Sequence, residues 1–243
     1  MLSDIGNSTL AIVIPTKNEG QNIRNVAEEL NITLHPNFIF VMDDSSTDDT
    51  ERQCELMLEG GVPIEFVKRT TNFGYGAATV HGMFKYLAVE ADWLLTIDGD
   101  GSHRTVDALT LYQSRGPGIT IGSRWTKGGK TIGWPLYRIV MSWCANTLAS
   151  RILNLKVRDK TNGFRIYDQQ TVKTLLKKDL PVGYDFLLAT LFIAKNSDIP
   201  IREIPTSFIQ RTQGSSNLGM KQIFEWIREL RTLKRGLVSD VKH

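Results

Sequence analysis

The segment Leu10-Ala11-Ile12-Val13-Ile14, followed by Pro15-Thr16-Lys17-Asn18-Glu19, decides the fold of this chain. Its first half is short, apolar and rich in β-branched residues, and its second half is polar. A run of this kind that stops at polar residues is typical of a buried strand. The same pattern recurs in four further runs: Phe38 to Met42, Ile64 to Lys68, Trp93 to Ile97 and Gly118 to Ile121.

Helical patterns separate these runs. We expect the first helix to begin near Glu19, the second near Asp48, and the third to run from Ala77 to about Val89. The third shows apolar residues at helical spacing, at Val80, Phe84, Leu87 and Ala88. Strands that alternate with helices predict an α/β fold with a doubly wound, parallel sheet. At 243 residues we expect one domain, spanning residues 1–243.

The composition is that of a soluble globular protein. Lys and Arg number 29 against 26 Asp and Glu, a net charge of +3 that is too mild to indicate a nucleic-acid partner. Cys54 and Cys144 form no metal or disulfide motif, which fits a reducing compartment. The segment from Met1 to Leu10 does not read as a signal peptide, and no window reaches the roughly 18 apolar residues of a membrane span. We therefore expect a chain that is neither secreted nor integral to a membrane.

Polar segments with acidic residues follow three of the predicted strands, and we expect them to converge on one edge of the sheet. Pro15 to Glu19 follows the first run, Asp43-Asp44 follows the second, and Asp98-Gly99-Asp100-Gly101-Ser102-His103 follows the fourth. In open α/β sheets, ligands bind beyond the carboxyl ends of the strands. Capping of a helix explains Asp48 or Thr47 but not two acids side by side. Because like charges repel, we expect a metal or a donor-rich ligand to compensate them.

Asp98 and Asp100 are the clearest metal ligands in the sequence. With Gly99 between them to allow an unusual turn, they can share one hard divalent cation and leave coordination positions for diphosphate oxygens. A nucleotide-sugar pocket is the natural site for such a pair. The stretch from Asn72 to Ala78 is not a dinucleotide fingerprint, because it follows the third strand and lacks the third glycine. It is either a glycine-rich turn onto a helix beside the pocket or a plain loop.

Together these motifs resemble the family 2 glycosyltransferases of the GT-A fold, and within them the dolichyl- or polyprenyl-phosphate mannose synthases. The resemblance covers about residues 10 to 220. It continues through Ile121-Gly122-Ser123-Arg124-Trp125, Arg138, Asp159 to Arg165, Gly183-Tyr184-Asp185-Phe186 and Arg211 to Ser216. It implies a mixed, mainly parallel sheet flanked by helices, with C-terminal amphipathic helices. Residues 10–110 would bind the nucleotide-sugar and residues 111–220 the acceptor.

The resemblance also implies roles by position. The donor nucleotide would lie on Pro15, Thr16, Glu19, Asp43, Asp44 and Asp98. Mg or Mn would bind Asp98, Asp100 and Ser102. The acceptor phosphate would contact Arg124, Arg138, Arg211 and Ser215, and the catalytic set would be Asp98, Asp100, Arg124, Arg138 and Arg211. The chain departs from the family pattern at Gly101, usually a bulky aliphatic residue, and at Asn217, usually Lys. It also reads Leu187-Leu188-Ala189 after Phe186, where many relatives carry a Glu.

The expected reaction is transfer of a hexose, with inversion, onto a polyprenyl or dolichyl phosphate; we expect mannose from GDP-mannose. A lipid phosphate is largely dianionic at neutral pH, so it needs arginines more than a base. A hydroxyl acceptor would need a carboxylate base, for which Asp159 and Asp185 are candidates. Alternatives are UDP-glucose or UDP-GlcNAc as donor, a glycan hydroxyl as acceptor, and a catalytically silent nucleotide-sugar-binding module. A nucleotidyltransferase is disfavoured, because Pro15 to Glu19 lacks its glycine-rich basic loop.

Two segments read as amphipathic helices. Gly133 to Leu155 carries Trp134 and Trp143 among aliphatic residues, and residues 218–238 combine apolar spacing with a basic face. Each could pack on the domain or lie on a membrane surface. We expect a peripheral protein on the cytoplasmic face of the membrane. A separate membrane-anchoring subunit stays open.

Overall fold

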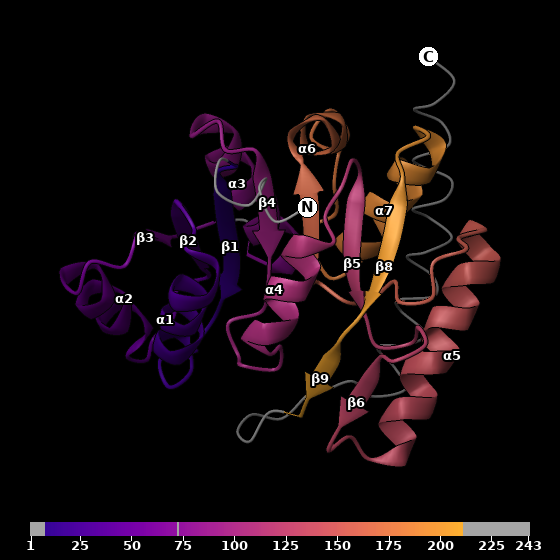
Figure 1. The fold of residues 1–243 in the computed structure, drawn as a ribbon, viewed down its shortest axis with the longest axis horizontal. Helices are drawn as coiled ribbons and strands as arrows, with labels where there is room; N and C mark the ends of the chain where they lie inside the picture. The colour runs from indigo at the N-terminus through magenta and orange to yellow at the C-terminus, as the bar shows by residue number, and fades with distance from the viewer. Residues whose placement is uncertain (1–7, 72, 211–243) are drawn as a thin grey trace.

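A seven-stranded sheet forms the centre of the computed structural model, in the order β3-β2-β1-β4-β7-β5-β8 (Figure 1). The structure describes residues 8–71 and 73–210, so Arg211, Ser215 and residues 218–238 lie outside the described residues. The strands of this sheet are β1 (Leu10–Thr16), β2 (Phe38–Asp43), β3 (Ile64–Lys68), β4 (Trp93–Thr96), β5 (Ile119–Ser123), β7 (Arg165–Asp168) and β8 (Ile201–Pro205). All neighbouring pairs are parallel except those of β7, which runs antiparallel to β4 and β5.

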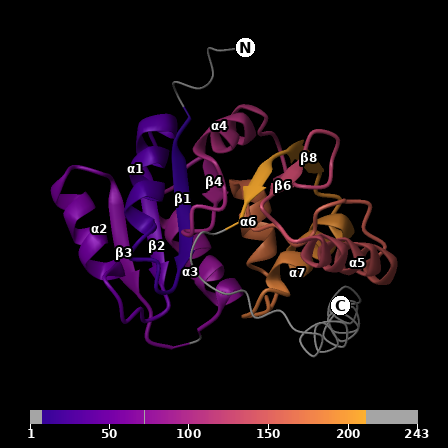
Figure 2. The same cartoon turned by 90° about the horizontal axis from the view of Figure 1, so that it is seen from below.

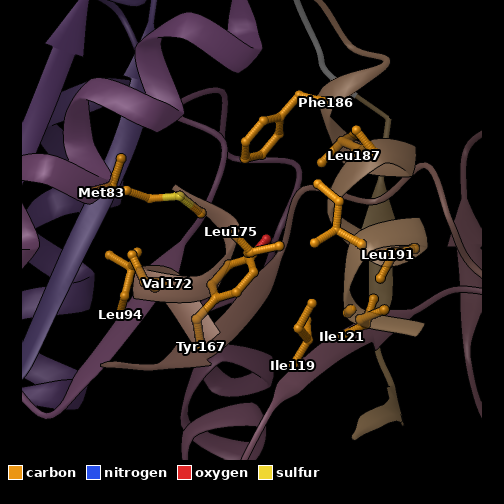
Figure 3. Close-up of a cluster of buried hydrophobic side chains, with 14 of the residues drawn as sticks. Met83, Leu94, Ile119, Ile121, Tyr167, Val172, Leu175, Phe186, Leu187 and Leu191 are labelled. Carbon is orange, nitrogen blue, oxygen red and sulfur yellow. The ribbon is translucent and has the colours of Figure 1, made fainter. Parts of the chain in front are cut away.

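Helices cover both faces of the sheet. One face packs against α1 (Ile23–Leu34), α2 (Thr50–Glu59) and α4 (Thr105–Gln113). The other packs against α3 (Tyr75–Ala88), α5 (Leu136–Leu153), α6 (Gln169–Leu175) and α7 (Phe186–Asn196). Figure 3 shows the second core, where Met83 of α3 and Leu175 of α6 lie among side chains of α7 and the sheet. Alternate residues of β1 pack into the cores on the two faces of the sheet, because successive side chains of a strand point to opposite faces.

The structure confirms the five strands expected from the sequence and the mixed, mainly parallel sheet of the GT-A fold. Two helix starts were placed too early. The first helix begins at Ile23 rather than near Glu19, and the second at Thr50 rather than near Asp48. The residues in between form loops joined by hydrogen bonds: Gly20 N donates to Asp48 Oδ2 over 2.9 Å, and Glu19 N to Thr50 Oγ1 over 3.0 Å.

Helix α3 forms where expected, but Phe84 does not face the core. Its side chain is 55% exposed, while Ala78, Met83 and Tyr86 are buried against the sheet. Gly82 lies on the buried face, and a Cβ there would be 2.7 Å from Val13 Cγ2 of β1. The small residues let α3 approach β1 closely, a detail that apolar spacing does not reveal.

A second, two-stranded parallel sheet lies at the carboxyl ends of the main strands. It pairs β6 (Lys130–Ile132) with β9 (Ser207–Ile209), both labelled in Figure 1, and the chain continues from β6 into α5 (Figure 2). Helix α5 confirms a helix within the predicted segment Gly133 to Leu155, but it begins at Leu136 and ends at Leu153. Several of its large apolar side chains face outward: Leu136, Tyr137, Val140 and Trp143 are each at least half exposed. Among the residues described, no helix combines the length and apolar character needed to cross a membrane.

Candidate active site

The loop after β4 carries the predicted metal ligands. Asp100 is buried, and its Oδ1 accepts a hydrogen bond of 2.9 Å from Ser102 N. Gly101 has a φ of +73°, a backbone conformation that favours glycine and allows the turn between Asp100 and Ser102. The glycine that replaces the family's bulky aliphatic residue is therefore compatible with this loop. Asp98 is the more open of the two acids, with 24% of its side chain exposed.

The residues of this loop fit a hard divalent ion. The donors are carboxylate oxygens and a hydroxyl, which Mg²⁺ and Mn²⁺ prefer. Ser102 Oγ is buried and makes no hydrogen bond within the described part of the chain, so it has capacity for a ligand. No group of three or more His, Cys, Asp or Glu side chains among the described residues forms a metal cluster. An ion here would need oxygens from a bound substrate to complete its coordination.

Two further side chains surround Asp98. His103 Nε2 lies 3.6 Å from Asp98 Oδ2, in a ring that is completely buried. On the other side, Tyr75 brings its hydroxyl to Gly163: a Cβ on that glycine would overlap the hydroxyl and lie 3.5 Å from Asp98 Oδ1. Burial and the nearby charge of Asp98 raise the pKa of Tyr75 well above its ordinary value. His103 belongs to the quoted motif and Tyr75 to the glycine-rich turn, yet sequence reasoning gave neither a role.

The predicted nucleotide residues gather at the ends of β1 and β2. Thr16 pairs in register with Asp43, both are buried, and Pro15 and Glu19 beside them are partly exposed. The expectation that a ligand compensates Asp43 and Asp44 needs correction. The Asp43 carboxylate accepts hydrogen bonds from Ser46 N and Oγ.

Asp44 is likewise occupied within the protein. Its carboxylate forms a buried ion pair with Arg69 and accepts a 2.6 Å hydrogen bond from Gly74 N. Asp44 therefore ties the end of β2 to the glycine-rich turn before α3. Burial acts to raise the pKa of Asp48, but its carboxylate accepts hydrogen bonds from Gly20 and Thr50. Together these hydrogen bonds outweigh burial and lower the pKa. The chain itself supplies the compensation that we expected from a ligand.

Arg124 lies at the end of β5 and is 6% exposed. Its Nε and Nη2 each donate over 2.7 Å to the two carboxylate oxygens of Asp159, which is completely buried. Nη2 also donates to Thr161 Oγ1 over 2.9 Å. Three aromatic rings surround the guanidinium at 5.4 to 6.0 Å: those of Trp125, Trp134 and Phe208. Only Nη1 makes no hydrogen bond to the residues that the structure describes, so it is the nitrogen left to meet a ligand.

Arg138, in the first turn of α5, stacks on Trp134 with Cζ 4.1 Å from the ring centre. Trp134 contacts Phe208 edge to face at 5.3 Å, and Phe208 contacts His103 in the same way at 4.9 Å. A continuous set of rings therefore joins the metal loop to the two arginines. The structure brings Asp98, Asp100, Ser102, Arg124 and Arg138 into this connected region. Sequence reasoning missed Phe208, since nothing in its local sequence distinguishes it.

The two carboxylates considered as bases differ in their surroundings. Both oxygens of Asp159 accept hydrogen bonds from Arg124, so this carboxylate is one half of a buried ion pair. Asp185 stands at the N-terminus of α7, and burial raises its pKa. Asp159 is thus engaged as the partner of an arginine rather than poised to take a proton.

Comparison with known proteins identifies the class to which this fold and site belong. Residues 11–176 match the family Glycosyl transferase family 2, so the chain belongs to this family and is a glycosyltransferase. The nucleotidyltransferase alternative is therefore wrong, and so is a non-enzymatic module.

Relatives of this chain include three named transferases. A polyprenol monophosphomannose synthase of Mycolicibacterium smegmatis is 31% identical over 242 residues, covering 93% of this chain and 90% of the relative. An undecaprenyl-phosphate mannosyltransferase of Micrococcus luteus is 29% identical over 85% of this chain and 86% of its own. A dolichol-phosphate mannosyltransferase of Pyrococcus furiosus is 30% identical over 93% of this chain, which spans 64% of that protein.

The fold also has solved counterparts. A glucosyl-3-phosphoglycerate synthase from Mycobacterium tuberculosis, crystallised with Mn²⁺, UDP and glucosyl-3-phosphoglycerate, superposes with a TM-score of 0.66. The match covers 93% of this chain and 78% of that one at 18% identity. A second crystal structure of that synthase, with Mn²⁺, UDP and phosphoglyceric acid, gives a TM-score of 0.67. At this identity the likeness establishes the GT-A fold alone.

Proposed function

We propose that this enzyme transfers mannose from GDP-mannose to a polyprenyl phosphate, with inversion, using Mg²⁺ or Mn²⁺. The names of the three relatives support this substrate pair. The observation that carries it is the connected region described above, in which Arg124 and Arg138 flank Trp134 at the start of an outward-facing apolar helix. Such an arrangement suits an acceptor with a charged phosphate head and a long hydrocarbon tail.

In this proposal residues 10–110 bind the donor and residues 111–220 the acceptor. Asp98 and Asp100, with Ser102, hold the ion, and the ends of β1 and β2 hold the nucleoside beside Pro15 and Thr16. A bound divalent ion supplies Lewis-acid stabilisation of the charge that grows on the leaving diphosphate. The loops after β1 and β2 are hydrogen-bonded to each other, for instance Asn18 N to Ser46 Oγ over 2.7 Å, which fixes this end of the site before the donor arrives.

An oxygen of the acceptor phosphate attacks the anomeric carbon, and the bond from that carbon to the donor diphosphate breaks, so that GDP leaves. A phosphate monoester has a second pKa of about 6, so at neutral pH it is already a nucleophile. Arg124 Nη1 and the Arg138 guanidinium orient it, with Arg211 and Ser215 as further ligands that we expect from the family pattern. Planar guanidinium groups suit this task because they bind phosphate oxygens in pairs. The engagement of Asp159 by Arg124 favours this acceptor over a hydroxyl, which would need a free base.

The membrane surface is the proposed location of the acceptor's tail. Leu136, Tyr137, Val140 and Trp143 form the outward face of α5, called here the α5 apolar face, and each is at least half exposed. Aromatic and aliphatic side chains of this kind insert at the boundary between lipid head groups and acyl chains. We propose a peripheral enzyme on the cytoplasmic face of the membrane, where this helix places Arg138 at the level of the lipid phosphate.

Transfer of labelled sugar to polyprenyl phosphate tests the proposal. GDP-mannose, UDP-glucose and UDP-GlcNAc are compared with Mn²⁺, with Mg²⁺ and with EDTA, and the lipid product is extracted into chloroform. We expect metal-dependent product from GDP-mannose alone, and at least a tenfold loss in Arg138→Ala. Arg24→Ala, which changes an exposed arginine of α1, should transfer at the wild-type rate. Product from UDP-glucose or UDP-GlcNAc would contradict the proposal that GDP-mannose is the donor. Transfer only to a glycan would contradict the proposal that a polyprenyl phosphate is the acceptor.

A further inference from the structure

His103 and Tyr75 place buried, unsatisfied polar atoms beside the Asp98 carboxylate. Neither His103 nitrogen has a hydrogen-bond partner among the described residues, and the same is true of the Tyr75 hydroxyl. A buried polar atom without a partner destabilises the state in which it occurs, because it has lost its hydrogen bonds to water. Two of these atoms, His103 Nε2 and the Tyr75 hydroxyl, lie beside the Asp98 carboxylate, which indicates a state of the site in which they form hydrogen bonds.

Both side chains are held in place by aromatic contacts. The His103 ring stacks on Phe164 at 4.6 Å and meets Phe208 edge to face at 4.9 Å. The backbone reinforces this position, since Ile209 N donates to Ser102 O over 2.9 Å and His103 forms a bridge with Phe208. The ring therefore cannot turn away from Asp98. The present 3.6 Å separation exceeds hydrogen-bond length by only a few tenths of an ångström.

Tyr75 is fixed in a comparable way from the opposite face of the sheet. Its ring stacks on Tyr184 at 5.0 Å and meets Phe186 edge to face at 6.5 Å. Gly163 leaves room for the hydroxyl, because any side chain there would overlap it. His103 Nε2 lies beside Asp98 Oδ2. The Tyr75 hydroxyl and Asp98 Oδ1 both lie near Gly163, where a Cβ would overlap the hydroxyl and be 3.5 Å from Oδ1.

We propose that His103 and Tyr75 are positioning residues that orient the Asp98 carboxylate as a metal ligand, each through a hydrogen bond that forms when the ion binds. This inference rests on the proposed metal-binding role of Asp98. Groups that orient a metal ligand are commonly worth 10- to 100-fold in metal affinity. Because His103 Nε2 and the Tyr75 hydroxyl have no hydrogen-bond partner among the described residues, the two side chains contribute to ion binding and not to the stability of the empty protein.

A Mn²⁺ titration, carried out with and without GDP, tests the proposed roles of His103 and Tyr75. Bound Mn²⁺ is measured as the loss of the electron paramagnetic resonance signal of the free ion. His103→Phe and Tyr75→Phe keep the aromatic packing and remove only the polar atoms. We expect each to weaken Mn²⁺ binding about 10- to 100-fold, with a melting temperature equal to or above that of the wild type. Tyr86→Phe is the matched control, since this buried tyrosine of the same helix donates to Asp92 O instead and should bind Mn²⁺ normally.

His103→Gln supplies a second measurement that does not depend on the aromatic replacement folding well. Its amide can still donate, so we expect Mn²⁺ affinity within about threefold of the wild type. Wild-type affinity in both phenylalanine variants would overturn this inference and leave the proposed function intact. If the wild-type enzyme itself binds no Mn²⁺ in either condition, the proposed metal role fails, and this inference fails with it.

Discussion

Arg124 and Asp159 form a buried pair in which two guanidinium nitrogens meet both carboxylate oxygens at 2.7 Å. The two residues are 35 positions apart and join the end of β5 to the loop that precedes β7. The pair gives Arg124 a fixed orientation within its surrounding aromatic rings. It also accounts for an acid that sequence reasoning considered as a base.

Removing the carboxylate from this pair should destabilise the enzyme strongly. In Asp159→Asn the Arg124 charge stays buried without its counter-ion, a situation that typically costs about 3–5 kcal/mol. Urea unfolding measures the change. The control is Glu28→Gln, which breaks the exposed Arg24–Glu28 pair on α1 and should cost no more than about 0.5 kcal/mol. Equal effects of the two substitutions would show that the buried pair is not structural.

Close packing between α3 and β1 predicts a second change in stability. Gly82→Ala places a methyl group against both methyls of Val13. We expect a loss of about 1–2 kcal/mol, because overpacking outweighs the better helix propensity of alanine. Adding Val13→Ala should recover part of this loss, with a coupling energy of about 1 kcal/mol in a double-mutant cycle. Gly60→Ala, at the end of α2 where there is space, should change stability by less than about 0.5 kcal/mol.

The two cysteines should differ in reactivity. Burial, together with the acidic charges of Asp43, Glu51 and Glu55, raises the pKa of Cys54 to about 12. At pH 8 this thiol is almost wholly protonated, and only the thiolate reacts. A disulfide reagent should therefore titrate one thiol quickly, the exposed Cys144, and the second only after unfolding. Cys144→Ser should show no fast reaction; a fast thiol in that variant would mean that Cys54 is accessible.

The α5 apolar face predicts lipid binding that depends on Trp143. Trp143 is 58% exposed, so Trp143→Ser should leave the fold stable. We expect at least a threefold drop in the fraction that sediments with anionic liposomes at low salt, because the aromatic anchor is lost. Ile32→Ser is the matched control, since Ile32 is 71% exposed on α1, on the other face of the sheet. A similar drop in both variants would exclude a specific role for the α5 apolar face.

Several features of this fold followed from local sequence pattern. The apolar runs of β1, β2, β4 and β5 are strands whose residues are almost all buried, and edge strand β3 buries Ile64; the short apolar pattern is visible without tertiary information. The starts of α1 and α2 were less predictable. Residues 17–22 and 44–49 are polar enough for a first helical turn, yet they hydrogen-bond to each other across the two loops.

Local sequence was enough to locate the apolar runs, the acids that follow them, and the family to which their spacing belongs. How those charges are used depends on contacts between distant segments. Arg69 neutralises Asp44 from 25 positions away, Asp159 orients Arg124, and Phe208 of β9 packs against His103 in the loop after β4. Local pattern reports which backbone a segment prefers, whereas ion pairs and ring contacts between distant segments depend on how the sheet brings strand ends together.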